Sequence, residues 1–588
     1  MKIFIALFLV LLSNVYGATW YVDTTGLDTN PGTSLLPFKT VGKGVSVAQA
    51  GDVVEIAAGT YGLTGIPGVT NNIDTVRSGT SVAPITFRGA GPTTVIRYVQ
   101  FFHDWIIVEN LKTAGNWSFY LESNNCIIQD SICDISLSTA EQCVWMQGNN
   151  PTHTKCHSHI IRNCQILNAK TGFKQALQLN GTGHLVENCY FAKTSNGPDC
   201  MWIFGTNHII RGCTVENWDQ VPYDPQIHMD VFQTFNDNGD QISKNILVER
   251  CFIKGGISCQ IGIMTDDQFD NSIENWTFRN NVFMNITADI QTFAPGFKFY
   301  NNTFYKCAYD KPFPVAFRTS SDRGNGHYPV IKGNIFYKST SPSTAGNPYH
   351  GFYDFNDTDG GPAIIINAGD IDGNHAIGVG AGLIKNGKWL GYRGVTFNAN
   401  GVNGVEPLFV NPNSATTVDD LRLLTGSPLI GVGQVLNATF TTDYSNVTRG
   451  AAWDIGALEF DVGSVPGDTT APTITSAVLD ATGQTVTVGF SESVQGIDLA
   501  HYAITGHTLS TLSGTGPTMV FNISPIRQAG ANFSMTYTGG SGRTRDDAGN
   551  LLATVTVTVT NNSLASAPDP DAPGWKGRSG SGTGGRRR

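Results

Sequence analysis

Residues 224–235 read DPQIHMDVFQTF and bring a histidine, a carboxylate and an amide close together at His228, Asp230 and Gln233. His228 and Asp230 are two residues apart, so in a β-strand they share a face at a spacing of roughly 6.6 Å. Gln233 would face the other way in a regular strand. A bend or bulge between Asp230 and Phe232 would let all three polar groups reach solvent together, as a catalytic site requires.

One chemistry that suits these residues is β-elimination on a uronic acid. A lyase needs a cation that neutralises the substrate carboxylate, which acidifies the C5 proton, and a base that removes this proton. His228 is the candidate base, with Asp230 and Gln233 beside it. The candidates for neutralising the carboxylate are Lys174, Arg318 and a Ca²⁺ ion held by Asp266, Asp267 and Asp230.

The other chemistry is hydrolysis of a glycosidic bond, which needs two carboxylates that flank the bond. The candidates to pair with Asp230 are Asp199, Asp266 and Asp267. For substrate binding outside the reacting centre, we expect contributions from Gln178, Trp202, Gln260 and Asp199.

The scaffold that must position these residues is repetitive. Related segments recur around an anchor residue that is cysteine in the first four and asparagine in the last three: Cys164, Cys189, Cys213, Cys251, Asn281, Asn302 and Asn334. The spacings are 25, 24, 38, 30, 21 and 32 residues, so a unit of 21–25 residues carries insertions. A repeat of this length predicts a solenoid.

The columns around the anchor indicate which solenoid this is. The residues three before and two after it are always apolar, and mostly β-branched or aromatic, which is typical of inward-facing strand positions. The residue immediately before it is Asn or Gly in all repeats except the one with Arg250, as a left-handed bend between strands requires. Short strands joined by single-residue bends predict a right-handed parallel β-helix.

Aligning the coils also predicts where the polar residues lie. Segments 174–180 and 199–205 stack on 230–235, which places Phe232 with Leu177 and Met201 inside and Gln233 with Gln178 and Trp202 outside. Trp145 and Trp202 are therefore candidate platforms for sugar rings, with core packing as the alternative.

Cysteine and histidine follow the same repeat. The anchor cysteines are expected to be unbridged core residues, because buried free cysteine behaves as a small apolar side chain. His159, His184 and His208 each precede an anchor by five residues and should stack in a column. Ile246 and Trp276 follow in that column, which favours a ladder that lines a turn over a metal site.

Two segments carry a family resemblance. Residues 19–61 contain Tyr-Val-Asp, an Asp- and Gly-rich loop, Pro-Phe-Lys-Thr and then Gly51, Asp52, Val54, Gly59 and Tyr61, and residues 427–433 and 449–460 read SPLIGVG and RGAAWDIGALEF. The first segment resembles the entrance of the pectate-lyase-like β-helix superfamily, including a short cap helix, and the second resembles its closing coils. The resemblance implies the fold and an extracellular polysaccharide as partner.

The resemblance does not extend to the best-known catalytic motifs. The glycosidase set of Asn-Thr-Asp, Asp-Asp, Gly-His-Gly and Arg-Ile-Lys is absent from the sequence, and so is the Arg-x-Pro-x-x-Arg of pectate lyases. The missing paired-carboxylate motifs favour a lyase of another branch over a hydrolase. A non-catalytic glycan-binding adhesin and a tailspike-like depolymerase are the alternatives.

The remaining segments define the domain organisation. Residues 1–18 read as a secretory signal peptide with cleavage near residue 17 or 18, which predicts an exported protein, and no later segment is apolar for long enough to span a membrane. The β-helix is expected over 19–462, a linker over 463–470, a β-sandwich resembling bacterial immunoglobulin-like domains over 471–561, and a disordered tail over 562–588. The net charge of −10 gives no support to nucleic-acid binding.

Overall fold

The structure is a computed structural model. It describes residues 17–62, 72–114, 118–134, 142–146, 156–169, 175–193, 199–216, 218, 230–236, 241–255, 260–267, 272–286, 289–291, 295–307, 316–320, 329–338, 353–356, 371–377, 384–385, 388–389, 398, 400–460, 471–495, 497, 499–513, 516–539, 544–546 and 550–564. The chain divides into two compact units, Met1–Glu459 and Phe460–Arg588.

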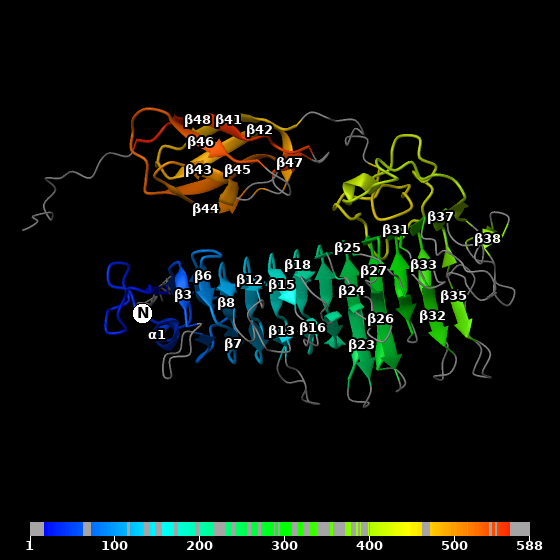
Figure 1. Cartoon of the computed structure of the whole chain (residues 1–588), viewed down its shortest axis with the longest axis horizontal. Helices are drawn as coiled ribbons and strands as arrows, with labels where there is room; N and C mark the ends of the chain where they lie inside the picture. Colours follow the sequence, from blue (N-terminus) through cyan, green and yellow to red (C-terminus); the bar gives the residue numbers. More distant parts are fainter. Residues whose placement is uncertain are drawn as a thin grey trace, which may run out of the picture. The chain divides into compact units, whose positions relative to one another are not determined.

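Three long sheets of parallel strands build the first unit, which is a right-handed parallel β-helix as predicted (Figure 1). Sheet 1 contains β1 (Thr19–Val22), β2 (Val53–Ile56), β5 (Ile85–Gly89), β8 (Ile106–Glu109), β11 (Ile127–Gln129), β14 (Ile160–Arg162), β17 (Leu185–Glu187), β21 (Ile209–Arg211), β24 (Ser243–Glu249), β27 (Ile273–Arg279), β30 (Lys298–Tyr300), β33 (Val330–Lys332) and β36 (Ile371–Asp372), with β20 (Gly205–Thr206) beside β24.

Sheet 2 contains β4 (Ile73–Asp74), β7 (Val99–Phe101), β10 (Phe119–Leu121), β13 (Gln142–Met146), β16 (Gln175–Leu179), β19 (Asp199–Ile203), β23 (Asp230–Asn236), β26 (Gln260–Asp267), β29 (Asp289–Gln291), β32 (Ala316–Ser320) and β35 (Tyr353–Asn356).

Sheet 3 contains β3 (Gly59–Tyr61), β6 (Thr94–Ile96), β9 (Lys112–Thr113), β12 (Ile132–Asp134), β15 (Gln165–Ala169), β18 (Tyr190–Lys193), β22 (Thr214–Glu216), β25 (Phe252–Lys254), β28 (Val282–Met284), β31 (Thr303–Tyr305), β34 (Ile335–Tyr337), β37 (His375–Ile377) and β40 (Val402–Asn403). A separate hairpin pairs β38 (Ile384–Lys385) with β39 (Lys388–Trp389).

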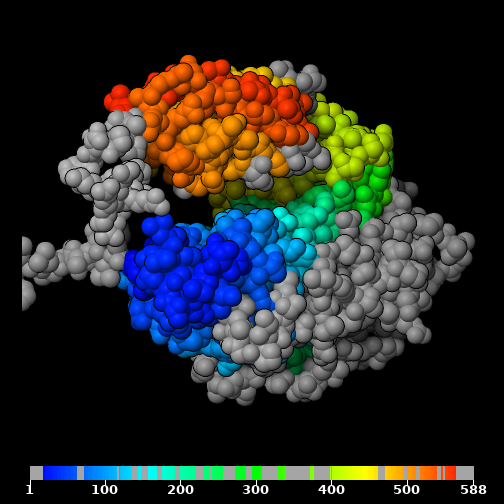
Figure 2. Space-filling model, turned by 60° about the vertical axis from the view of Figure 1, so that its left-hand side comes forward, coloured from blue at the N-terminus to red at the C-terminus, as the bar shows by residue number. Residues whose placement is uncertain are grey.

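The predicted cap helix is α1 (Val41–Val47), which contacts β1, β2 and β4. Thr40 caps it by accepting a hydrogen bond from the Lys43 N–H at 3.2 Å. Val41, Gly44 and Val45 of the helix are buried. Together with the loop before it, the helix covers the N-terminal end of the coils, which carries the darkest blue atoms in Figure 2.

The bend between sheets 1 and 3 has the conformation that the Asn/Gly column predicted. The residue before the anchor has a positive φ in each coil, for example 53° at Asn163, 52° at Asn188 and 62° at Gly212. Arg250, the exception in sequence, adopts the same bend at 54°. Backbone geometry is therefore repeated even where the residue type is unfavourable for it.

The anchors form a buried ladder. All cysteines of the described residues are free and buried, as expected for a thiol ladder. From Asn281 onward the ladder is hydrogen-bonded: Asn302 Oδ1 accepts from the Asn281 backbone N–H at 3.0 Å, and Asn334 Oδ1 accepts from that of Asn302 at 2.9 Å. Each amide thus satisfies a backbone donor of the preceding coil, which a buried bend would otherwise leave unpaired.

The segment 404–460 corrects one prediction. We expected RGAAWDIGALEF to form closing coils, but within the described residues this segment adds no strand to the three sheets. It folds back instead, because its apolar side chains Phe409, Leu429 and Ile455 pack in one cluster with Val282 and Tyr305 of sheet 3. The 3-10 helix η1 (Asp419–Leu421) belongs to this segment.

The second unit is all β, with its own apolar core. Its strands are β41 (Ile474–Leu479), β42 (Thr485–Gln495), β43 (Tyr502–Ile504), β44 (Thr508–Ser513), β45 (Gly516–Ser524), β46 (Phe533–Tyr537), β47 (Arg545–Asp546) and β48 (Val555–Asn561), with η2 (Leu499–His501) before β43. The pairing is antiparallel except between β41 and β48. The immunoglobulin-like assignment of this unit stays a prediction.

Candidate functional site

Sheet 2 carries a row of polar and aromatic residues that stack in register from coil to coil. We call this the outer row: Gln100, Tyr120, Trp145, Gln178, Trp202 and Gln233. Their sequence neighbours Phe119, Leu177 and Phe232 are fully buried in the core. Because side chains alternate along a strand, the outer row points away from the core.

The register confirms the predicted alignment of the coils. Phe232 pairs with Met201, and Gln233 pairs with Trp202. The pairing of β23 with β26 shifts register here: Asp230 pairs with Gln260 and Phe232 with Ile263. The extra residue therefore lies in β26 and not in β23, where a bend or bulge between Asp230 and Phe232 was predicted. Beyond Gln233 the backbone register of the row continues through Met264, Gln291, Arg318 and Asp354.

Two groups of aromatic rings flank Gln178 on this face. In the first, the Tyr120 and Trp145 ring centroids lie 5.3 Å apart at an interplanar angle of 80°. In the second, Phe235 packs edge-on against Trp202 at 5.1 Å and against Phe204 at 5.0 Å. Edge-to-face contacts hold the rings in fixed orientations, as a preformed binding surface requires.

Asp199 holds the second group in place. Its Oδ2 atom accepts a hydrogen bond from the Trp202 indole N–H at 2.8 Å, and its Oδ1 atom accepts one from the Asp230 backbone N–H at 2.8 Å. The side chain is 8% exposed. Asp199 therefore orients Trp202 and fixes the start of β23 against β19.

The exposure of the polar trio differs from the expectation that it reaches solvent. Asp230 is 2% exposed and Gln233 is 7% exposed. For Asp230 the reason is strand periodicity: it lies two residues before the core residue Phe232, on the same face, and Asp199 binds its N–H. His228, the third member, lies outside the described residues.

Two side-chain polar atoms close to the outer row are buried. Within the described residues, neither the indole N–H of Trp145 nor Oε1 of Gln175 makes a hydrogen bond. The Gln175 amide N–H donates to Gln178 Oε1 at 2.5 Å, which connects it to the outer row. Leaving a buried donor and a buried acceptor unpaired costs free energy.

Several predicted site residues are placed only in part. Lys174 lies outside the described residues, and Gln260, Asp266, Asp267 and Arg318 are placed by their backbones alone. Asp266 pairs with Phe235 and Asp267 with Asn236, so both belong to the coil beside β23. The calcium site there stays a prediction.

The histidine column has the ladder arrangement that the sequence favoured. The imidazoles of His159, His184 and His208 stack at 5.1 and 4.8 Å. Nδ1 of His184 accepts a hydrogen bond from the His159 backbone N–H at 3.1 Å. Nδ1 of His208 accepts one from the His184 backbone N–H, also at 3.1 Å. Burial lowers the pKa of His159 and His208 to about 4 and that of His184 in the same direction. The described residues contain no cluster of His, Cys, Asp and Glu suited to a metal ion.

Tyr120 of the outer row was not among the residues singled out from the sequence, and Gln175 was considered only as a neighbour of the candidate site. Both follow from extending the coil alignment, since Tyr120 pairs with Trp145 and Gln175 with Asp199. The insertions between these coils hide the pattern in the sequence.

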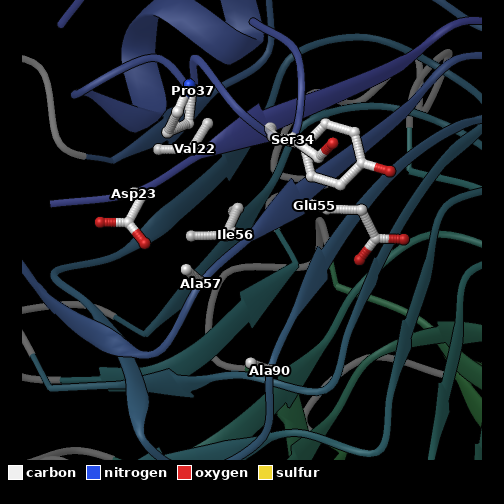
Figure 3. A pocket seen from close by; sticks show the side chains of 9 residues that line it. Val22, Asp23, Ser34, Pro37, Glu55, Ile56, Ala57 and Ala90 are labelled. Carbon is white, nitrogen blue, oxygen red and sulfur yellow. The ribbon is translucent and has the colours of Figure 1, made fainter. Parts of the chain in front are cut away.

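A pocket of about 230 Å³ lies near the N-terminal end of the β-helix (Figure 3). Asp23 and Glu55 line it together with Tyr21 and apolar residues that include Ile56. Both carboxylates are engaged within the protein, Asp23 with the Thr25 N–H at 2.8 Å and Glu55 with Arg88 at 2.8 Å. The outer row of sheet 2 is therefore the better candidate site.

Comparison with known proteins adds the following findings. Residues 24–65 match the family described as "Protein of unknown function (DUF1565)". No curated protein matches the chain by sequence. Within the described residues, the helices are too short or too polar to cross a membrane.

Several solved structures are similar to this chain at low identity and low TM-score. Pectate lyase Pel9A is 15% identical, with a TM-score of 0.40, over 76% of this chain and 96% of its own. A rhamnogalacturonan lyase is 14% identical, with a TM-score of 0.34, over 69% of this chain and 94% of its own. A tailspike protein from an Acinetobacter baumannii bacteriophage, described as a capsular polysaccharide depolymerase, is 10% identical, with a TM-score of 0.30, over 88% of this chain and 86% of its own.

Proposed function

We propose that this protein binds an extended uronic-acid-containing polysaccharide along the outer row of sheet 2 and cleaves it by β-elimination. The observation that carries the proposal is the outer row itself, in which aromatic rings and amides alternate from Trp145 to Gln233 and Asp199 holds Trp202 in place. Such a row supports a polymer rather than a small molecule, because it extends over six consecutive coils from Gln100 to Gln233.

The dimensions fit an oligosaccharide. From Tyr120 to Arg318 the row makes seven steps between paired strands, which at about 4.8 Å each amounts to roughly 34 Å. The rings of Trp145 and Trp202 offer flat apolar faces for sugar rings.

The cleavage step assigns roles to the predicted residues. His228 takes the C5 proton of the uronic acid, the electrons of that bond form a C4=C5 double bond, and the glycosidic oxygen on C4 leaves and takes up a proton. Arg318 or Lys174 neutralises the substrate carboxylate, which stabilises the developing negative charge. Asp266, Asp267 and Asp230 would hold a Ca²⁺ ion if one binds, and it would supply the same neutralisation. Hydrolysis by Asp230 and Asp199 is less favoured, because Asp199 is engaged through both oxygens and both side chains are buried.

The decisive experiment incubates the purified protein with a panel of uronic-acid polymers and follows the ultraviolet absorbance of the unsaturated product, with and without EDTA. A lyase produces this absorbance, and His228→Ala should abolish it while binding is retained. New reducing ends without the absorbance would mean hydrolysis. Binding without any turnover would mean a glycan-binding adhesin.

Trp202→Ala tests the binding row. If stacking on the Trp202 ring contributes about 1.4 kcal/mol to the binding free energy, its loss should weaken binding of the polymer roughly tenfold. Tyr190→Ala is the matched control, because Tyr190 is a partly exposed aromatic residue of the neighbouring coil on sheet 3. Equal affinities of the two variants would contradict the placement of the polymer on sheet 2.

A further inference from the structure

A buried carboxylate lies where the first strand of the β-helix begins. Asp52 is 5% exposed and accepts three hydrogen bonds: from the Ala18 backbone N–H at 2.7 Å, the Trp20 indole N–H at 2.8 Å and the Gln49 backbone N–H at 2.9 Å. All three donors are neutral. Among the ion pairs of the described residues, none includes Asp52.

Ala18 is held in place from both sides of its backbone. Its carbonyl accepts a hydrogen bond from the Val53 N–H at 2.9 Å, and β1 continues directly from it in parallel register with β2. Its nitrogen therefore points at Asp52 because the strand pairing places it there. The short distance of 2.7 Å is typical of hydrogen bonds that involve a charged partner.

The residue before Ala18 has almost no room. A Cβ atom at Gly17 would lie 1.9 Å from the Gly51 carbonyl oxygen and 2.5 Å from the Asp52 nitrogen. Only glycine can occupy this position while Ala18 is bound. Glycine has no Cβ and is accommodated there, whereas any residue with a side chain would clash with the Gly51 backbone.

We propose that the chain is cut between Gly17 and Ala18, and that the new α-ammonium group of Ala18 forms a buried ion pair with Asp52. In this hydrolysis the hydroxyl of water joins the Gly17 carbonyl carbon, the C–N bond breaks, and Ala18 nitrogen takes the proton. At neutral pH the products are a carboxylate on the removed segment and an ammonium on the retained one.

The sequence is compatible with this cut, since residues 1–18 read as a secretory signal with small residues at Gly17 and Ala18. The structure distinguishes between the two expected positions of cleavage. A cut after Ala18 would remove the nitrogen that Asp52 binds and leave the buried carboxylate without that donor. Cleavage between Gly17 and Ala18 instead gives Ala18 an α-ammonium group, a cation at the start of the first strand that lies next to the Asp52 carboxylate.

The first test is the mass and N-terminal sequence of the protein exported by its own signal. The expected N-terminus is Ala18. An exported protein that starts at Thr19 or later, or that keeps Gly17, would overturn the proposal.

The second test compares purified full chains that begin at Ala18 or at Asn14. The chain beginning at Ala18 should melt at a higher temperature, and its α-amine should react with an acylating reagent at least tenfold more slowly than that of the longer chain. Asp52→Asn should remove this protection in the Ala18 chain and leave the longer chain's α-amine unaffected. Equal reactivity of the Ala18 and Asn14 amines would refute the ion pair, even if the Asp52 variant failed to fold.

Discussion

Acidification from pH 7 to pH 5 is expected to destabilise the β-helix through the column of His159, His184 and His208. All three imidazoles are buried, and their Nδ1 atoms accept hydrogen bonds from backbone N–H groups, so the folded protein needs them neutral. In the unfolded chain a histidine has a pKa of about 6.5. Below that pH the unfolded state therefore binds more protons than the folded state, and stability falls.

The magnitude follows from the difference between the two pKa values. The folded-state pKa of His159 and His208 is about 4. Each of these two histidines then lowers the free energy of unfolding by about 2 kcal/mol at pH 5. The decrease is complete only when the pH falls below the folded-state pKa. His184 is shifted in the same direction, so the three together give a slope of roughly 4 kcal/mol per pH unit between pH 6 and pH 5.

The asparagine ladder of the other bend supplies the matched variant. There, Asn302 Oδ1 accepts the backbone N–H of the preceding coil, as His184 Nδ1 does in the histidine column. The triple variant His159→Asn, His184→Asn, His208→Asn should keep these acceptors but not titrate. Its loss of stability on acidification should be smaller than that of the wild type by about 4 kcal/mol or more.

Guanidinium denaturation at a series of pH values between 7.5 and 5 measures this difference, with the fluorescence of the buried Trp276 in the same column as a reporter. Other titrating groups contribute equally to both proteins and cancel. If wild type and triple variant lose the same stability between pH 7 and pH 5, the histidines are not neutral acceptors in the fold, and the reasoning is refuted.

Two further substitutions test the ladder and the folded-back segment. Asn302→Ala removes the acceptor of the Asn281 N–H and the donor to the Phe278 carbonyl. The free energy of unfolding measured with denaturant should therefore fall by about 3 kcal/mol. A decrease below about 1 kcal/mol would contradict the role of the ladder. Arg449→Met leaves the buried Glu459 without its cation and should cost about 3–5 kcal/mol, whereas adding Glu459→Gln should restore part of that loss. If the double variant is no more stable than the single one by thermal melting, the pair does not stabilise the segment.

The candidate site was predictable in its register but not in its exposure. Phe232 inside and Gln233 outside followed from the repeat, because strand periodicity assigns faces once the coils are aligned. The burial of Asp230 and the engagement of Asp199 were not predictable, since they depend on a contact between β19 and β23 across 31 residues. Likewise the closing motif was recognised, yet its packing against Val282 and Tyr305 depends on apolar surface contributed by distant coils.

By itself the sequence determined the parallel β-helix, its left-handed bends and the unbridged cysteines, because each of these is a local property that every coil repeats. The tertiary structure alone decided which polar groups are buried and which atoms they bind. Asp52 illustrates the difference: the sequence marks it as part of a family motif, and only the pairing of β1 with β2 places the nitrogen of Ala18 against its carboxylate. Such contacts join residues from different coils, and their energies depend on burial that no local pattern encodes.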